Sequence, residues 1–258
     1  MTVVPTDTIE VAPSQLNLEG GEVKMVSDQR HTRRGGYYWI DGEPFVSVTE
    51  VIKVLAKPAL QYWFGKEVWR AMCANPTLSE KEALNAPYQI TEDAKSRGTT
   101  IHSIVEAYKH SHEYIDGVPE QFRGYAQAFY KWTEDNHVAI VEHERTVVSR
   151  EFGYAGTLDL LAMLNGNKLP VVVDVKTGKD IYPDAFLQLA AYRQALKEEG
   201  QEASGVAVLL LQEGGDYKYQ FSTNHPLKQF TACKVLWEWL NREDHEKVIK
   251  YARKGGKQ

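Results

Sequence analysis

The sequence has few cysteines and no long apolar run, and both absences narrow the class of protein. Its 258 residues include 2 cysteines, Cys73 and Cys233, which are too few for a disulfide framework or a four-cysteine iron–sulfur cluster. We therefore expect reduced thiols in a cytoplasmic protein. No stretch approaches the roughly 20 apolar residues that a membrane-crossing helix needs. The opening residues, MTVVPTDTIEVAPSQ, lack the basic and apolar regions of a signal peptide, so we expect none.

The chain also lacks an excess of positive charge. Its formal net charge is −5, and phosphate binding favours a basic surface, so the sum argues mildly against a nucleic-acid partner. Carboxylates that hold a metal ion count as negative in this sum, however, and a bound cation reverses the local field. Basic residues cluster at 30–34 and 247–257; a solvated tail or helix face is the competing explanation for each cluster, and we favour it for the C-terminal one. Charge therefore leaves a nucleic-acid substrate open.

Two apolar stretches near the middle of the chain each carry one carboxylate. The segment VVVDVK, Val171–Lys176, is β-branched and apolar, as an interior strand is. Burying Asp174 there costs free energy unless a cation or hydrogen bonds compensate. Side chains alternate along a strand, so Asp174 and Lys176 point to one face. We expect Asp159 on the preceding strand, after a turn at Gly156-Thr157. Two carboxylates beside a lysine suit Mg²⁺ or Mn²⁺.

Helical and strand patterns surround these two segments. We expect a hairpin over 37–46 with its turn at Asp41-Gly42. Helices are expected at 47–55, where Pro58 ends the helical pattern, at 60–73, 79–85 and 91–111, and after Pro119, Pro183 and Pro226. Further strands are expected at 139–149, 206–211 and 217–221. Ser79 and Glu82 form a capping box in this scheme. Trp63 and Trp69 are expected in the core rather than as a stacking platform for bases.

Apolar spacing also predicts which faces of the helices point inward. In the helix after Pro119, the stripe of Phe122, Tyr125, Phe129 and Trp132 should enter the core. In the last long helix, the residues expected to face inward are Phe230, Val235, Leu236, Trp239 and Leu240.

Four motifs in order resemble the PD-(D/E)XK nuclease superfamily, specifically its RecB-like exonuclease branch. They are Thr100-Ile101-His102 on a predicted helix, GTLD ending at Asp159, DVK from Asp174 to Lys176, and QLAAY from Gln188 to Tyr192. A D-x-K triplet is common by chance, but four motifs in sequence on the expected helix, strand, strand and helix are specific. The segment FVSVT at residues 45–49 adds a weaker resemblance to phage-type exonucleases.

The resemblance implies an α/β protein with a restriction-endonuclease-like αβββαβ core. In this fold a central mixed sheet is flanked by helices, here with an N-terminal, mainly helical addition. Residues 1–28 are expected to form a flexible arm, and residues 29–258 a single nuclease domain. That domain would comprise the hairpin and helical addition (29–90), the catalytic core (91–221) and C-terminal helices (222–258).

The resemblance also implies a metal centre with one or two Mg²⁺ or Mn²⁺ ions. Some members of this branch carry a four-cysteine iron–sulfur cluster, and two cysteines are too few for one, so no such cluster is expected here. Its ligands would be His102, Asp159, Asp174 and the main-chain carbonyl of Val175. The catalytic residues would be Asp159, Asp174 and Lys176. An ordinary lysine is a poor base at pH 7, so we expect Lys176 to position the attacking water or stabilise developing charge rather than to take a proton.

Three polar residues near the DVK and QLAAY motifs have implied supporting roles. Gln188 and Tyr192 lie four apart on one helix face and would contact DNA near the scissile bond. Thr177 would let the chain bend away from the site. For Gln188 and Tyr192, ordinary helix polarity is the competing explanation.

Two glutamates have more ambiguous roles. Glu106 shares a helix face with His102 and would orient it or a water on the metal. Glu144 lies two residues after Glu142 on a predicted strand, with both side chains on one face. It would be the acidic residue that the family often has on its first strand, or else an exposed strand charge, and the sequence favours neither.

The resulting functional hypothesis is a metal-dependent DNA exonuclease acting in recombination, repair or replication. Its substrate would be single-stranded DNA or the ends of duplex DNA. We expect the protein in the cytoplasm, which would be that of the host cell if it is a phage protein. A recombination or replication protein is a further candidate partner. The alternatives are a structure-specific endonuclease, a non-catalytic DNA-binding module of the same fold, and a metal hydrolase with a non-nucleic substrate. Fold resemblance alone does not decide among them.

Overall fold

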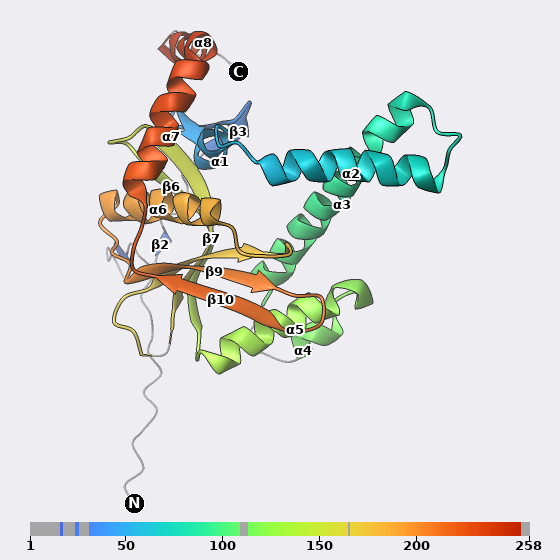
Figure 1. Ribbon diagram of the computed structural model, residues 1–258. Helices are drawn as coiled ribbons and strands as arrows, with labels where there is room; N and C mark the ends of the chain where they lie inside the picture. The colour runs from blue at the N-terminus through green and yellow to red at the C-terminus, as the bar shows by residue number, and fades with distance from the viewer. Residues whose placement is uncertain (1–15, 18–23, 26–30, 109–112, 165, 254–258) are drawn as a thin grey trace, which may run out of the picture.

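The computed structural model describes residues 16–17, 24–25, 31–108, 113–164 and 166–253. Within these residues, a mixed β-sheet lies between two layers of helices (Figure 1). Its strands are β3 (His31–Arg34), β4 (Tyr37–Ile40), β5 (Glu43–Ser47), β6 (Ala139–Ser149), β7 (Tyr154–Met163), β8 (Val171–Lys176), β9 (Gly205–Leu211) and β10 (Tyr217–Ser222). The sheet order is β10-β9-β8-β7-β5-β4-β3, and β6 also pairs with β7.

Helices precede, interrupt and follow the central strands. They are α1 (Val48–Ile52), α2 (Pro58–Ala74), α3 (Glu80–Glu106), α4 (Glu113–Asp116), α5 (Glu120–Asp135), α6 (Pro183–Glu198), α7 (Leu227–Leu240) and α8 (Arg242–Arg253). From α5 through β6, β7, β8 and α6 to β9, the chain runs α-β-β-β-α-β. This order, around a mixed sheet with helices on both faces, confirms the predicted restriction-endonuclease-like fold.

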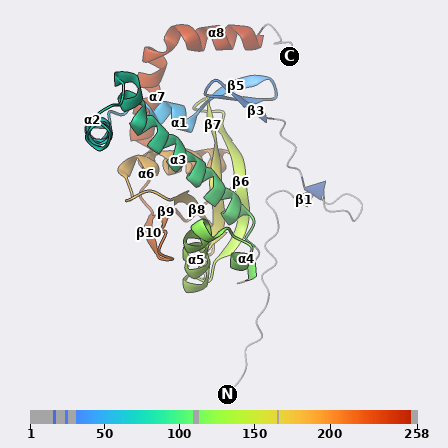
Figure 2. The same ribbon diagram turned by 90° about the vertical axis from the view of Figure 1, so that its right-hand side faces the viewer.

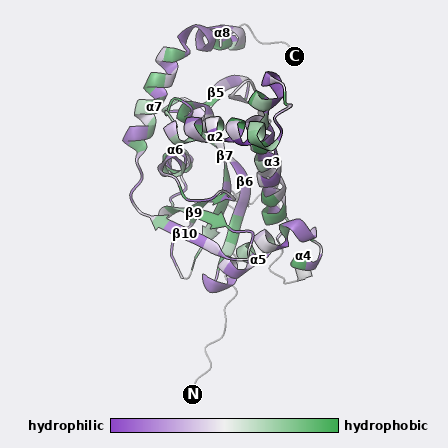
Figure 3. Ribbon diagram, turned by 45° about the vertical axis from the view of Figure 1, so that its right-hand side comes forward, coloured by the Kyte–Doolittle hydropathy of each residue, from purple (hydrophilic) through white to green (hydrophobic). Residues whose placement is uncertain are grey.

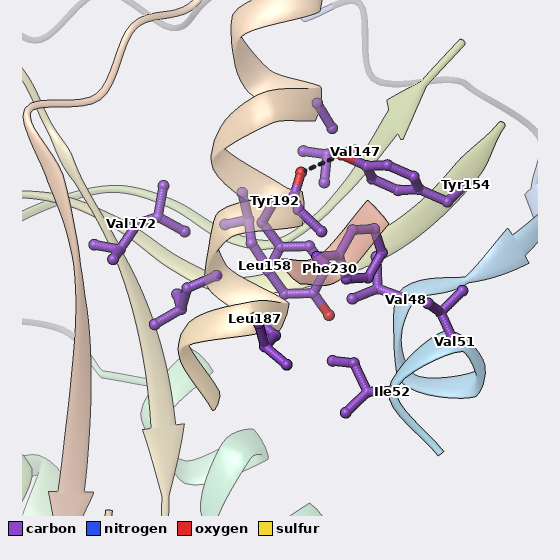
Figure 4. Close-up of a cluster of buried hydrophobic side chains, with 14 of the residues drawn as sticks. Val48, Val51, Ile52, Val147, Tyr154, Leu158, Val172, Leu187, Tyr192 and Phe230 are labelled. Atoms are coloured by element: carbon purple, nitrogen blue, oxygen red, sulfur yellow. Dashed lines mark hydrogen bonds between the residues drawn. The ribbon is translucent and has the colours of Figure 1, made fainter. Parts of the chain in front are cut away.

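The central strands are apolar throughout because helices cover both faces of the sheet. Along β8, Val172 packs in the cluster that contains side chains of α1, α6 and α7, whereas Val173 packs in the cluster that contains side chains of α3 and α5. Val208 and Leu209 of β9 divide in the same way. Figure 4 shows the first of these clusters beside α6. A strand that is apolar on both faces therefore indicates a doubly covered sheet.

The N-terminal hairpin extends this sheet. Strands β4 and β5 pair antiparallel around Asp41 and Gly42, whose φ angles of 52° and 82° are those that a two-residue type I′ turn requires. β5 then runs parallel to β7, so the hairpin is continuous with the central strands. Most of the predicted arm at 1–28 lies outside the described residues; within it, β1 (Leu16–Asn17) pairs antiparallel with β2 (Lys24–Met25).

Helix α3 is one long helix where the sequence predicted two. The expected helices at 79–85 and 91–111 are a single element, Glu80–Glu106, which runs through Pro87 and across the expected boundary at residue 90. Pro87 is buried within the helix, and this burial offsets the backbone hydrogen bond that a proline cannot donate. The predicted capping box is present: Glu82 N–H donates to Ser79 Oγ at 3.4 Å, and Ser79 N–H donates to Glu82 Oε2 at 2.8 Å.

Two apolar stripes that were predicted for the core lie on the surface. Trp69 of α2 is 66% exposed, and Trp239 of α7 is 72% exposed, although Phe230 of α7 is buried as expected. The other exposed members of the α7 stripe are Val235, Leu236 and Leu240. Helix α2 and the first half of α3 project away from the sheet (Figure 1), and Figure 3 shows hydrophobic and hydrophilic residues mixed along α2 and α7. Among the described residues, no helix combines the length and apolar character that crossing a membrane would require.

Candidate active site

The site lies beside β7, at the point along one edge of this strand where its pairing changes from β5 to β8. Tyr154 and Ala155 pair with β6 on one edge and with β5 on the other, whereas residues 160–162 pair with β6 and with β8. Because a strand has two edges, β5 and β8 lie along the same edge at different positions. The GTLD segment, residues 156–159, faces the interval between them. The predicted turn at Gly156-Thr157 is wrong, since both residues lie within β7.

Strands β7 and β8 bring the two expected carboxylates together. Their register pairs Leu160 with Val173, so the next residues along are Asp159 and Asp174. Opposed residues of antiparallel strands have their side chains on the same face. Asp159 Oδ2 accepts a hydrogen bond from the main-chain N–H of Val175 at 2.7 Å, which ties the two strands together just beyond their backbone pairing. The two acids therefore lie side by side.

Asp174 is the most deeply buried acid of the site, with its side chain 1% exposed. Its Oδ1 accepts hydrogen bonds from Lys176 Nζ at 2.7 Å and from Gln188 Nε2 at 3.1 Å. Its Oδ2 is buried with no hydrogen-bond partner among the described residues. A buried carboxylate oxygen without a partner costs free energy. A cation at this oxygen would remove that cost.

Helix α6 fixes the amide that holds Asp174. Gln188 Nε2 also donates to the hydroxyl of Tyr192 at 3.0 Å, and the ring of Tyr192 is 3% exposed. That ring lies against Gly156, where a Cβ would come within 2.3 Å of Tyr192 Cε1. The glycine of GTLD thus permits close approach of a ring, rather than a turn. Tyr192, which was expected to contact DNA, is buried and holds Gln188.

Helix α3 brings His102 to the same place, as Figure 2 shows by its course from α2 to β6 and β7. His102 Nδ1 lies 3.4 Å from Glu144 Oε1 and 3.7 Å from Asp159 Oδ1. One ligand atom from each of these three residues lies within 4.8 Å of the others. Glu144 has a φ of 43° inside β6, which few non-glycine residues adopt, and such strain clusters at functional sites. Glu144 therefore lies within the site.

The other two glutamates have different surroundings from those expected. Glu106 is exposed, and the hydrogen bond of His102 goes to Glu144 instead. Glu142 pairs with Arg145 at 2.9 Å. The positive φ of Glu144 breaks the alternation of side chains along β6, so the prediction that Glu142 and Glu144 share a face is wrong.

Sequence reasoning missed two neighbours of the site, Tyr182 in the segment after β8 and Lys57 before α2. Thr177, which was expected to let the chain bend away, is half-buried, and the chain then leads to Tyr182, which is 60% exposed. Lys57, just before α2, donates to Asp184 of α6 at 2.6 Å. The sequence offered one signal for Tyr182, which is the proline that follows it, Pro183. A proline restricts the residue before it to an extended backbone.

Burial and like charge shift the proton affinities of the site. Burial, followed by the nearby Asp174 carboxylate, raises the pKa of Asp159 to about 7, against the opposing effect of His102 and Lys176. Burial alone would lower the pKa of Lys176, but the two aspartates outweigh it and hold that pKa above its ordinary value. Burial likewise lowers the pKa of His102, and Glu144 and Asp159 outweigh it, so the net pKa is raised. Lys176 therefore remains an ammonium group, a hydrogen-bond donor rather than a base.

Comparison with known families agrees with this fold. The family model of the PD-(D/E)XK nuclease superfamily matches residues 112–255, more than half of the chain. The chain belongs to the PD-(D/E)XK nuclease superfamily. A solved structure described as "Crystal structure of SSO0001" is similar with a TM-score of 0.36 and 14% sequence identity, over 76% of this chain and 75% of that one. No curated protein matches the chain.

The donor set of this PD-(D/E)XK protein fits the divalent metal ions that the superfamily uses. The unpartnered, buried Oδ2 of Asp174 and the close group of His102, Glu144 and Asp159 both favour a bound cation. Carboxylate oxygens are the ligands that Mg²⁺ and Mn²⁺ prefer. His102 precedes the residues that the family model matches, so its place in the site rests on the geometry of α3.

Proposed function

We propose that this nuclease is a divalent-metal-dependent DNA exonuclease that hydrolyses phosphodiester bonds with Mg²⁺ or Mn²⁺. The observation that carries the proposal is the pair of adjacent acids, Asp159 and Asp174, with Lys176 Nζ hydrogen-bonded to Asp174. The exonuclease assignment follows the resemblance of GTLD, DVK and QLAAY to the RecB-like branch. That branch and the phage-type resemblance also suggest DNA ends as the substrate and recombination, repair or replication as the process.

The ligands in this proposal are Asp159, Asp174, His102 and the main-chain carbonyl of Val175, for one or two ions. Glu144 joins them because its carboxylate lies within the same group of ligand atoms. When bound, divalent ions neutralise phosphate charge and lower the pKa of water. The protein holds the acids in place through the Val175 N–H on Asp159 and through Gln188 on Asp174.

Lys176 has the separate role of a fixed cation beside the acids. Its raised pKa keeps three N–H donors on Nζ at neutral pH. One contacts Asp174 Oδ1, and the side chain is 39% exposed, which leaves the ammonium group accessible to a substrate phosphate. It therefore orients the attacking water or stabilises the charge that develops on phosphate oxygens.

The decisive experiment incubates the protein with end-labelled linear single-stranded DNA, linear duplex DNA and covalently closed circular DNA. Each is tested with Mg²⁺, with Mn²⁺ and with a chelator. An exonuclease shortens the linear substrates from an end and leaves the circles intact, with no product under chelation. Cutting of closed circles at the same rate would show an endonuclease, and DNA binding without cleavage under either metal would show a binding module.

The role of Lys176 has its own test. Lys176→Gln removes the cation but keeps a polar side chain, so turnover should fall by at least about tenfold, given the size of typical electrostatic contributions at such sites. Metal affinity, measured by titration calorimetry, should change much less because Lys176 is no ligand. Equal losses in turnover and in metal affinity would contradict this role and indicate that Lys176 mainly supports the acids.

A further inference from the structure

A hollow of about 270 Å³ opens beside the paired acids. Lys176 and Gln188, which both contact Asp174, line it together with Lys57 and the segment that leads into α6. Whatever fills the hollow therefore lies next to the bond that the site would cut. Its volume is just below the roughly 300 Å³ at which pockets for drug-sized ligands begin. That size suits one nucleoside and is too small for a base pair.

The charges around the hollow balance. Lys57 is neutralised by Asp184 at 2.6 Å, and Asp180 lies 3.4 Å from Lys218. Asp180 and Asp184 would repel a phosphate group here and offset the attraction of Lys57 and Lys218. Lys176 remains directed at the paired acids, where the scissile phosphate would lie. The hollow therefore favours an uncharged group over a phosphate.

The walls offer the contacts that a flat, mainly apolar ring needs. Ile52, Ala185 and Val208 contribute apolar surface to the lining. Tyr182 also lines the hollow, and 60% of its surface is exposed. Its backbone is extended, with φ −105° and ψ 147°, as Pro183 after it requires. This restraint limits the directions that the Tyr182 ring can take, and an exposed ring on a fixed backbone is a stacking surface.

We propose that this hollow binds the unpaired base of the nucleotide next to the scissile phosphate, with Tyr182 stacking on that base. The inference rests on the proposed nuclease function and adds which form of DNA the enzyme prefers. A base must be unpaired from the complementary strand before it can enter the hollow. Single strands and frayed ends are then better substrates than closed duplex ends. Tyr182 acts as a positioning residue that holds the nucleotide while the acids and Lys176 face its phosphate.

The test uses single-stranded oligonucleotides that carry one abasic nucleotide at a defined position. Because base stacking on an aromatic side chain contributes about 1–3 kcal/mol, the parent protein should slow by about tenfold or more at the bond beside the abasic nucleotide. Tyr182→Ala should cut intact DNA slower by a similar factor and show no further slowing at the abasic position. Tyr182→Phe, which keeps the ring, should behave as the parent does.

Tyr251→Ala is the matched control, since Tyr251 is also partly exposed but lies on α8, away from the hollow. It should slow at the abasic position as the parent does. Melting temperatures of all variants should agree, because both tyrosines are exposed. Persistence of the abasic slowing in Tyr182→Ala, or the same defect in Tyr182→Phe as in Tyr182→Ala, would overturn the inference.

A binding measurement separates failure of this inference from failure of the proposed function. An oligonucleotide with 2-aminopurine at the equivalent position should lose fluorescence on binding to the metal-free parent and to Tyr182→Phe, but not to Tyr182→Ala. If the parent cuts no DNA yet shows this Tyr182-dependent quenching, the nuclease proposal fails and the base site stands. If it cuts DNA but quenching does not depend on Tyr182, the base site fails alone.

Discussion

The site-bearing strands and the helical arm formed by α2 and residues 80–95 of α3 both contain apolar residues but bury them to different extents. In β9, every residue from Gly205 to Leu211 is buried. In α2, the described structure leaves every residue at least partly exposed, including Tyr62 at 76%. The difference lies in what surrounds each element, since β9 has helices on both faces whereas α2 contacts mainly α3. Periodicity indicates an element's type, and the rest of the chain decides its burial.

The same contrast applies to polar groups. In the arm, Glu92 is exposed and pairs within one turn of helix with Lys95. Asp174 is buried, and its Oδ1 accepts hydrogen bonds from Lys176 of the same strand and from Gln188 of α6. Exposed pairs contribute little to stability, whereas a buried acid needs a defined partner for each oxygen. A buried acid with an unpartnered oxygen therefore marks function in a way that a surface acid does not.

The largest effect is expected from the buried acid. Asp174→Asn keeps the shape but loses the charge, so cleavage should fall by more than about a hundredfold, since even residues that only support metal ligands cost about 10- to 100-fold when changed. The stabilisation of folding by added Mg²⁺ or Mn²⁺ should also disappear, which thermal unfolding with and without metal measures.

Asp216→Asn is the control for this change, because Asp216 is an exposed acid paired with Lys131 outside the site. It should retain parental cleavage and the metal-induced rise in melting temperature. Parental activity in Asp174→Asn would remove the basis of the proposed function.

The next effect compares two tryptophans. Trp132→Ala removes a fully buried ring and should lower the free energy of unfolding by about 3–5 kcal/mol. Trp69→Ala removes a ring that is 66% exposed and should change it by no more than about 0.5 kcal/mol. Urea unfolding of both variants measures the difference. A large loss for Trp69→Ala would show that the arm's apolar face is covered in solution.

Much of the fold could be predicted because its strongest signals are local. The apolar, β-branched residues of Val171–Lys176 indicate a strand without knowledge of the rest of the fold. Asp41-Gly42 indicates a hairpin turn with positive φ angles, and the structure confirms those angles. The helices predicted at 79–85 and 91–111 are the single helix α3, whose continuity through the buried Pro87 no local signal indicated. The exposed faces of α2 and α7 were misjudged for the same reason, since an amphipathic pattern does not name its partner.

The part of the candidate site that lies on neighbouring strands could be predicted from the sequence. Asp159 and Asp174 were expected on adjacent strands, and their side-by-side position follows from the pairing of β7 with β8. The side chain of Glu144 reaches the site because its φ angle is positive. A glutamate in the sequence does not indicate such an angle, so this position could not be predicted. Tyr192 against Gly156, and Lys57 against Asp184, join segments far apart in the chain. Such contacts arise only when the fold is complete.

A smaller effect separates two glycines. Gly156→Ala places a Cβ within 2.3 Å of the Tyr192 ring and should destabilise by about 1–3 kcal/mol through overpacking. Gly65→Ala in α2 meets nothing within 4 Å and should stabilise by about 0.5–1 kcal/mol, because alanine favours a helix interior. Opposite signs in chemical unfolding would confirm the contrast between the site and the arm. Two losses of equal size would contradict it.

The smallest effect concerns the cap of α3, which lies in the arm while the other end of the same helix carries His102. Ser79→Ala removes the side chain that accepts from Glu82 N–H and should cost about 1 kcal/mol of helix stability, visible as faster amide exchange in the first turns. Ser79→Asp should restore protection, because aspartate is also a good N-cap. Cleavage should stay at the parental rate in both variants, since at 1.5 Å per residue His102 lies about 35 Å along the helix. Loss of activity with Ser79→Ala alone would show that fraying reaches the site, and that the arm and the site unfold as one unit.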